Sequence, residues 1–132
     1  MFEVCVTGRF VATHRLRRPD GSTEELHEHP WHVRVTYAGP RLDDMGVLVD
    51  FGALRGRLDA ALAALHEQDL NHLPPFARRN PSAENVAVYV AEQLPHELPG
   101  AARLTCVEVE EAVGCCARYC PAPHAGPTRP CG

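Results

Sequence analysis

The chain is organised around the stretch Leu26-His27-Glu28-His29-Pro30-Trp31-His32-Val33-Arg34-Val35. From Val33 to Tyr37, β-branched and polar residues alternate, which is the pattern of a strand. Residues two apart on a strand share a face, so His27 and His29 are expected to point the same way. Two imidazoles side by side can supply two adjacent ligands of a tetrahedral Zn²⁺, with Zn–N bonds of about 2.0–2.1 Å. The stretch therefore predicts a strand that carries part of a zinc site.

A third ligand is expected from His14, the last residue of a first predicted strand over residues 2–14. Pairing of the two strands in a hairpin would bring His14 alongside the other two histidines. Three histidines with an open fourth position are the ligand set of a catalytic zinc rather than a structural one. A His-x-His pair on a strand is more often solvated or part of a core, and this alternative stays open from spacing alone.

Five motifs then follow one another along the chain. They are Phe10-Val11-Ala12-Thr13-His14-Arg15-Leu16, the His-x-His strand, Gly46-Val47-Leu48-Val49-Asp50-Phe51-Gly52, Asn80-Pro81-Ser82-Ala83-Glu84-Asn85, and Glu111 eight residues before Tyr119. In this order and spacing the chain resembles the 6-pyruvoyl-tetrahydropterin synthase and 6-carboxytetrahydropterin synthase family, over about residues 2–120. The resemblance implies a zinc lyase acting on 7,8-dihydroneopterin triphosphate. It also implies a homo-oligomer, commonly a hexamer made of two trimeric barrels.

The resemblance assigns two residues to the pterin. Glu111 corresponds to the carboxylate that anchors the ring, because a carboxylate can accept paired hydrogen bonds from a ring N–H and an exocyclic amine. Glu110 is the alternative one residue earlier, although it would point to the opposite face. A plain charged strand residue is the other interpretation of Glu111. Ser82 is expected mainly as a helix cap, with a lesser role in touching the pterin.

The family's catalytic cysteine is missing. It lies four residues before the first histidine of the pair, and this chain has Thr23 there, whose hydroxyl is far too weak an acid to be a ready base. Glu24 or Glu25 could supply a carboxylate instead, one or two residues out of register. Thr23 and Glu24 are therefore the candidate catalytic residues of this segment.

The family's Asp-His pair also differs, because His66-Glu67 carries the imidazole and the acid in the opposite order. A shift of one residue turns a side chain by about 100° around a helix, so composition alone does not preserve the function. General acid–base work by His66, oriented by Glu67 or Asp69, is the hypothesis. A solvent-exposed helix end is the alternative.

Two helices are predicted between two pairs of strands. Residues 51–66 form the first helix, with Asp50 as N-cap and one apolar stripe. Residues 67–81 are expected to be a loop, and Ser82 caps a second helix over 83–94. The two inward faces consist of Leu54, Leu58, Ala61, Leu62 and Leu65, and of Val86, Tyr89, Val90 and Leu94.

The remaining strands are predicted over residues 26–38, 104–111 and 117–119. The order ββααββ predicts an α+β fold, a four-stranded antiparallel sheet with two helices on one face, known as the T-fold in the resembled family. Exposed sheet edges favour closure into a β-barrel between subunits. Residues 1–120 would form this domain, and the Pro-rich tail 121–132 is expected to be disordered.

Composition excludes several classes of function. The chain has 132 residues, 45% hydrophobic and 23% charged, as in an ordinary one-domain protein. The net charge of −4 argues against nucleic acid or an anionic membrane as partner. No basic leader begins the chain and no apolar run is long enough to span a membrane, so a cytoplasmic location and reduced thiols at its six cysteines are expected.

The leading hypothesis is a zinc-dependent lyase for a reduced pterin, resembling 6-carboxytetrahydropterin synthase. The alternative is a pterin-binding paralogue with altered or lost catalysis, because the family's Cys and Asp-His pair are replaced. The sequence does not decide which pterin is used, which residue replaces the Cys, or how many subunits assemble.

Overall fold

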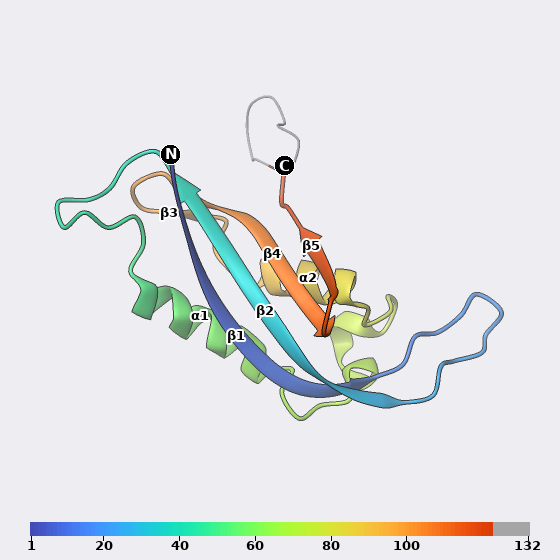
Figure 1. Cartoon of the computed structure of the whole chain (residues 1–132). Coiled ribbons are helices and arrows are strands. Elements are labelled where there is room, and N and C mark those ends of the chain that lie inside the picture. The colour runs from blue at the N-terminus through green and yellow to red at the C-terminus, as the bar shows by residue number, and fades with distance from the viewer. Residues whose placement is uncertain (123–132) are drawn as a thin grey trace.

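The computed structural model describes residues 1–122, which form a curved antiparallel sheet with helices on one face (Figure 1). The elements follow the order β1 (Phe2–His14), β2 (His27–Gly39), α1 (Phe51–Ala63), α2 (Ala83–Glu92), β3 (Glu97–Leu98), β4 (Ala102–Ala112) and β5 (Cys115–Tyr119). Two short 3₁₀ turns, Leu70–His72 and Pro74–Phe76, lie between the helices. The strand order is β1-β2-β4-β3, and β5 also pairs with β4.

The predicted antiparallel sheet with two helices is confirmed, and the predicted strand number is wrong by one. The additional strand β3 has only two residues and pairs with the start of β4. Two residues cannot display a period of two, so the sequence pattern gave no sign of β3. Within residues 1–122, no helix is long and apolar enough to cross a membrane.

Helix α1 ends three residues earlier than predicted, at Ala63. The chain turns instead at Glu67, whose φ of 60° is in the left-handed region that no helix interior contains. The Glu67 amide donates to the Val11 carbonyl at 2.7 Å, so the turn is held against β1. The polar residues after the helix therefore cap the edge of the sheet.

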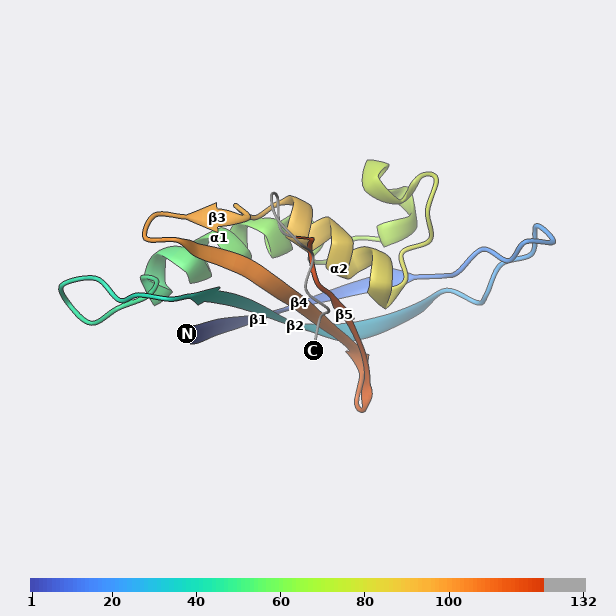
Figure 2. The ribbon, with the colours of Figure 1, turned by 90° about the horizontal axis from the view of Figure 1, so that it is seen from above.

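Both helices cover the same face of the sheet, as Figure 2 shows from above. Helix α1 packs on β1, whereas α2 packs on β4 and β5. Each predicted apolar stripe is buried, which confirms the inward faces. Their members are at most 9% exposed: Leu54, Leu58, Ala61, Leu62, Leu65, Val86, Tyr89, Val90 and Leu94.

Strand β2 alternates between this covered face and the opposite one. Trp31, Val33, Val35 and Tyr37 are all at most 1% exposed, whereas His32 between them is exposed. The same odd-numbered series includes His27 and His29, so the two histidines lie on the helix-covered face. The strand pattern therefore fixes which side of the sheet carries the site.

The C-terminal part ends the sheet with β5. Among the described residues, Cys5, Cys106, Cys115 and Cys116 are free thiols. Cys120 is disulfide-bonded, which differs from the expectation of reduced thiols. The predicted disorder of the tail falls, from residue 123 onward, outside the described residues.

Helix α1 packs closely against β1 at Gly8. A Cβ atom there would lie 2.8 Å from Leu62 Cδ1 and 3.3 Å from Leu58 Cδ2. We therefore expect Gly8→Ala to lower the free energy of unfolding by about 1–3 kcal/mol, because Leu62 has to move in a packed core. Denaturant unfolding measures the effect.

The matched control for this substitution is Gly56→Ala. Gly56 is exposed within α1, and an added Cβ meets nothing within 4 Å. This variant should raise the free energy of unfolding by up to about 1 kcal/mol, the difference in helix propensity between the two residues. Equal stability of the two variants would contradict the close approach of α1 to β1.

Candidate metal and pterin site

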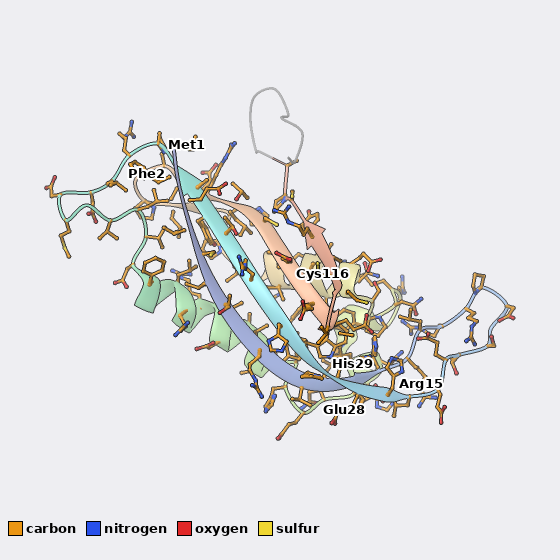
Figure 3. The ribbon with its side chains drawn as sticks, viewed as in Figure 1. Met1, Phe2, Arg15, Glu28, His29 and Cys116 are labelled. Carbon is orange, nitrogen blue, oxygen red and sulfur yellow. The ribbon has the colours of Figure 1, made fainter. Side chains whose placement is uncertain are left out.

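Strands β1 and β2 bring the three predicted histidines together. In their register His14 lies opposite His27, and Ala12 lies opposite His29. The centroid of the His14 ring is 4.5 Å from that of His27 and 5.2 Å from that of His29, and the last two are 4.6 Å apart. In Figure 3 the labelled His29 lies toward the end of the hairpin from which the loop 15–26 extends.

Main-chain carbonyls fix the orientation of two of these rings. His14 Nδ1 lies 2.7 Å from the carbonyl oxygen of Pro81, and His27 Nδ1 lies 2.8 Å from that of Glu25. A carbonyl oxygen only accepts, so each Nδ1 carries the proton, and Nε2 of the neutral ring presents a lone pair. Metal-binding histidines are commonly oriented by such a contact.

Glu111 on β4 joins the histidines. Its Oε1 lies 2.7 Å from His14 Nε2 and 3.2 Å from His29 Nε2. One ligand atom from each of His14, His27, His29 and Glu111 lies within 4.8 Å of all the others. Glu111, which the family resemblance assigns to the pterin ring, therefore faces the imidazole cluster.

The four side chains fit a metal ion. The Nε2 atoms of His14 and His29 are buried and have no hydrogen-bond partner in the described part of the chain, although a carboxylate oxygen is close to both. Three imidazole nitrogens and a carboxylate are a set of electron-pair donors, and a divalent cation is the partner that such a set lacks. The cluster of His14, His27, His29 and Glu111 could therefore hold a metal.

The surroundings favour the neutral form of His29. Trp31 is fully buried and meets the His14 ring edge-on, with 4.8 Å between ring centroids. Burial lowers the pKa of His29 from its ordinary 6.5, Glu111 opposes this effect, and His14 and His27 lower the pKa further. A neutral imidazole is the form that binds metal, so the site is prepared for a cation.

Arg17 and Asn80 anchor the segment that holds His14. The Arg17 amide donates to Asn80 Oδ1 at 2.8 Å, and Asn80 Nδ2 donates back to the Arg17 carbonyl at 3.0 Å. The Arg17 guanidinium also donates to the carbonyl of Phe76 at 2.6 Å. Since Asn80 directly precedes Pro81, these contacts position the carbonyl that accepts from His14.

A second asparagine, Asn71, makes the same pair of hydrogen bonds with Arg15, two residues before Arg17. The Arg15 amide donates to Asn71 Oδ1, and Asn71 Nδ2 donates to the Arg15 carbonyl, both at 2.9 Å. The two carboxamides thus bond alternate residues of the chain beyond β1, as a neighbouring strand would.

The predicted catalytic residues make their contacts elsewhere in the described chain. Thr23 forms an isolated bridge with Arg17, and Glu24 Oε1 accepts from the Leu16 amide at 2.9 Å. His66 Nδ1 accepts from the Val11 amide at 3.1 Å, at the edge of β1, and neighbouring Glu67 is exposed. Their catalytic role stays a prediction.

Ser82 has the contact expected of a helix cap, because its Oγ accepts from the Asn85 amide at 3.1 Å. The site also contains residues that sequence reasoning missed. Trp31 could have been found as the next member of the odd-numbered series after His29. Asn80 and Pro81 belong to the motif Asn80–Asn85, in which the sequence predicts a role only for Ser82.

Comparison with known proteins agrees with this geometry. A model of the family described as 6-pyruvoyl tetrahydropterin synthase matches residues 3–122. The chain belongs to this family. The 6-pyruvoyl tetrahydropterin synthase of Caenorhabditis elegans has the same fold, with a TM-score of 0.80 and 21% identity over 92% of this chain and 96% of that one.

Two curated relatives carry different names. The dihydroneopterin monophosphate aldolase of Pyrococcus furiosus is 31% identical over 81 residues, which are 61% of this chain and 66% of that enzyme. The chain thus aligns with just under two thirds of that relative's length. The 6-carboxy-5,6,7,8-tetrahydropterin synthase of Rickettsia typhi is 26% identical over 64% of this chain and 74% of that enzyme.

The anchor formed by Arg17 can be tested by its effect on metal binding. Arg17→Ala removes the guanidinium that bonds the carbonyls before Pro81, so the Pro81 carbonyl should orient His14 less well. We expect the affinity for Zn²⁺ to fall by about tenfold, the lower end of the effect of losing a group that orients a metal ligand. Competition with a chromophoric chelator measures the affinity.

Arg18→Ala is the control, because the exposed Arg18 guanidinium contacts only the Ser22 hydroxyl, at 3.4 Å, among the described side chains. Its affinity for Zn²⁺ should equal that of the wild type. Equal affinities of the two variants would show that Arg17 does not position His14.

Proposed function

We propose that this protein is a zinc-dependent lyase that acts on the side chain of a reduced pterin such as 7,8-dihydroneopterin triphosphate. The observation that carries the proposal is the convergence of three imidazoles, with His14 Nε2 and His29 Nε2 buried and without hydrogen-bond partners among residues 1–122. A zinc ion held there by His14, His27 and His29 would polarise a side-chain oxygen of the substrate and stabilise negative charge on it.

The remaining roles belong to the side chains of this protein. The carbonyls of Pro81 and Glu25 hold His14 and His27 in one orientation, and buried Trp31 excludes water from their side. Glu111 would accept hydrogen bonds from the pterin ring when substrate binds, with Ser82 as a lesser contact. The substrate would thus be gripped by its ring while its side chain reaches the histidines.

Proton transfer requires a base and an acid, and no thiol stands at the family's Cys position. We propose that Thr23 and Glu24 are the catalytic residues at this position, and that Glu24 or Glu25 is the carboxylate base. A glutamate is named as a catalytic residue of the Plasmodium vivax 6-pyruvoyltetrahydropterin synthase, which supports a carboxylate in this role. His66 and Glu67 would be the second proton-transfer pair.

Two substrates are candidates for a lyase reaction on the pterin side chain, 7,8-dihydroneopterin triphosphate and dihydroneopterin monophosphate. Carbon–carbon cleavage of the pterin side chain takes a proton from a side-chain hydroxyl and leaves the bonding electrons on the ring side, to be protonated there. The Pyrococcus furiosus relative is named as an aldolase for dihydroneopterin monophosphate, which favours this cleavage as the second activity to assay. The alternative is a pterin-binding paralogue without turnover, favoured by the replaced Cys and the swapped His66-Glu67.

We also propose a cytoplasmic homo-oligomer, such as a hexamer of two trimeric barrels. Strand β1 is an edge of the described sheet. Val11 and Thr13 bond to residues 66–68 on its outer side, whereas no described strand pairs with the outer side of residues 3–9. A second copy added to this edge would remove it and would lie next to His66 and Glu67.

The metal site and the reaction can be tested together. Purified wild type should contain about one zinc per chain, and His29→Ala should lose most of it, because a ligand is removed. His32→Ala is the matched control, since His32 lies on the opposite, exposed face of the same strand. Elemental analysis measures the zinc.

The same proteins should be incubated with 7,8-dihydroneopterin triphosphate and with dihydroneopterin monophosphate. We expect the wild type and His32→Ala to release a side-chain aldehyde or a pyruvoyl product, and His29→Ala to be at least about a hundredfold slower, as expected when metal-assisted charge stabilisation is lost. Pterin binding without turnover in the wild type would favour the paralogue. Zinc-free wild type would overturn the proposal.

Assembly can be tested at the open edge of β1. Thr7 is in the outward-facing series of Val11 and Thr13, so Thr7→Pro removes an outward amide and leaves the bonds to β2 in place. We expect this variant to elute as a monomer in light-scattering chromatography, whereas Thr7→Ala and the wild type assemble. A wild-type monomer, or an assembled Thr7→Pro, would contradict the proposed use of this edge.

A further inference from the structure

Glu111 has two partners that exclude each other. The family resemblance gives it to the pterin ring, whereas in the structure its Oε1 lies 2.7 Å from His14 Nε2 and 3.2 Å from His29 Nε2. The carboxylate is part of the only group of four potential metal ligands found among the described residues. One carboxylate cannot bind a cation at the histidines and grip a pterin ring through the same oxygens.

The contact between Glu111 and the neutral His14 ring is not a hydrogen bond. His14 Nδ1 donates to the Pro81 carbonyl, so His14 Nε2 of the neutral ring presents a lone pair toward the carboxylate. Within residues 1–122, neither His14 Nε2 nor His29 Nε2 has a hydrogen-bond partner. An anionic oxygen that faces the lone pair of His14 Nε2 is repelled by it unless a positive charge lies between them. The arrangement is therefore that of four ligands around one cation.

The backbone supports this orientation of Glu111. The pairing of β4 with β5 shifts register between Glu110 and Ala112, so Glu111 is the unpaired residue of a β-bulge. Bulges re-aim side chains and are frequent next to active sites. The Glu111 side chain is only 27% exposed, although the neighbouring hairpin tip at Val113 is almost fully exposed. The carboxylate is thus turned inward at the mouth of the cluster.

We propose that Glu111 is the fourth metal ligand of the substrate-free protein and that a bound pterin draws the carboxylate away from the metal. This inference rests on the proposed zinc-dependent, pterin-binding function. With Glu111 in place, the four ligands make a closed site of the structural kind, whereas its departure leaves the three-histidine open site of the catalytic kind. The pterin ring would thereby open the position that its own side chain then uses.

The experiment compares Glu111→Gln with Glu110→Gln in the full-length protein. Glu110 is adjacent, lies opposite His32 on the other face of the sheet, and is not among the four ligands. Chelator competition should give at least a tenfold weaker affinity for Zn²⁺ in Glu111→Gln and no change in Glu110→Gln, the tenfold being the least effect expected for a group that binds or orients at a metal. Circular dichroism establishes that both variants are folded.

Cobalt substitution tests the exchange itself. The Co²⁺ absorption spectrum of the wild type and of Glu110→Gln should change when neopterin is added, because the ligand set changes. Glu111→Gln should have an altered spectrum before neopterin is added. Once neopterin is bound, the spectra of this variant and of the wild type should become alike, because both sites then contain three histidines and the pterin side chain.

The outcomes separate this inference from the proposed function. Unchanged zinc affinity in Glu111→Gln, together with lost neopterin binding, would make Glu111 a pterin anchor only and overturn the inference while the zinc site stands. A wild-type cobalt spectrum that neopterin does not alter would make Glu111 a permanent ligand and also overturn the exchange. Absence of zinc and cobalt binding in the wild type would overturn the proposed function itself.

Discussion

The pairing register of β1 with β2 is the constraint on which the site depends. His14 and His27 lie directly opposite each other, and His29 is opposite Ala12, one step along the covered face. Because side chains alternate with a period of two, a slip by one residue would send His14 to the other face from His27 and His29. The buried residues of both strands hold this register. The packing of the hydrophobic core therefore also fixes the positions of the metal-binding histidines.

Regular patterns made the fold and the histidine cluster predictable from sequence. The leucine stripe of α1 and the alternation of β2 each repeat over many residues, and packing agrees with the alternation of β2 as far as Tyr37. The odd-numbered series from His27 to Tyr37 then places the metal-binding candidates without further information. What a repeating pattern could not indicate was the two-residue strand β3 and the early end of α1 at a residue with positive φ.

The orientation of single polar groups was less accessible. Glu111 was assigned by its distance from Tyr119, but its direction depends on a bulge, which alternation along β4 does not disclose. The carbonyls of Pro81 and Glu25 are main-chain groups, and no side-chain identity marks them as partners of His14 and His27. The acid–base candidates are predicted only from their positions in motifs. Thr23 and Glu24 make their contacts within the loop after β1, and His66 makes its contact at the edge of β1.

Side-chain amides beyond the end of β1 have a consequence for how the molecule can vary. The side chains of Asn71 and Asn80 form hydrogen bonds with the main chain of Arg15 and Arg17, as a neighbouring strand would. The chain is therefore held in place before the tip of the hairpin begins. The tip, from Pro19 to Ser22, is exposed or nearly so and is closed by its own Asp20–Ser22 turn. Because Asn71 and Asn80 bond the chain between the tip and His14, insertions at residues 19–22 would leave the positions of the histidines unchanged.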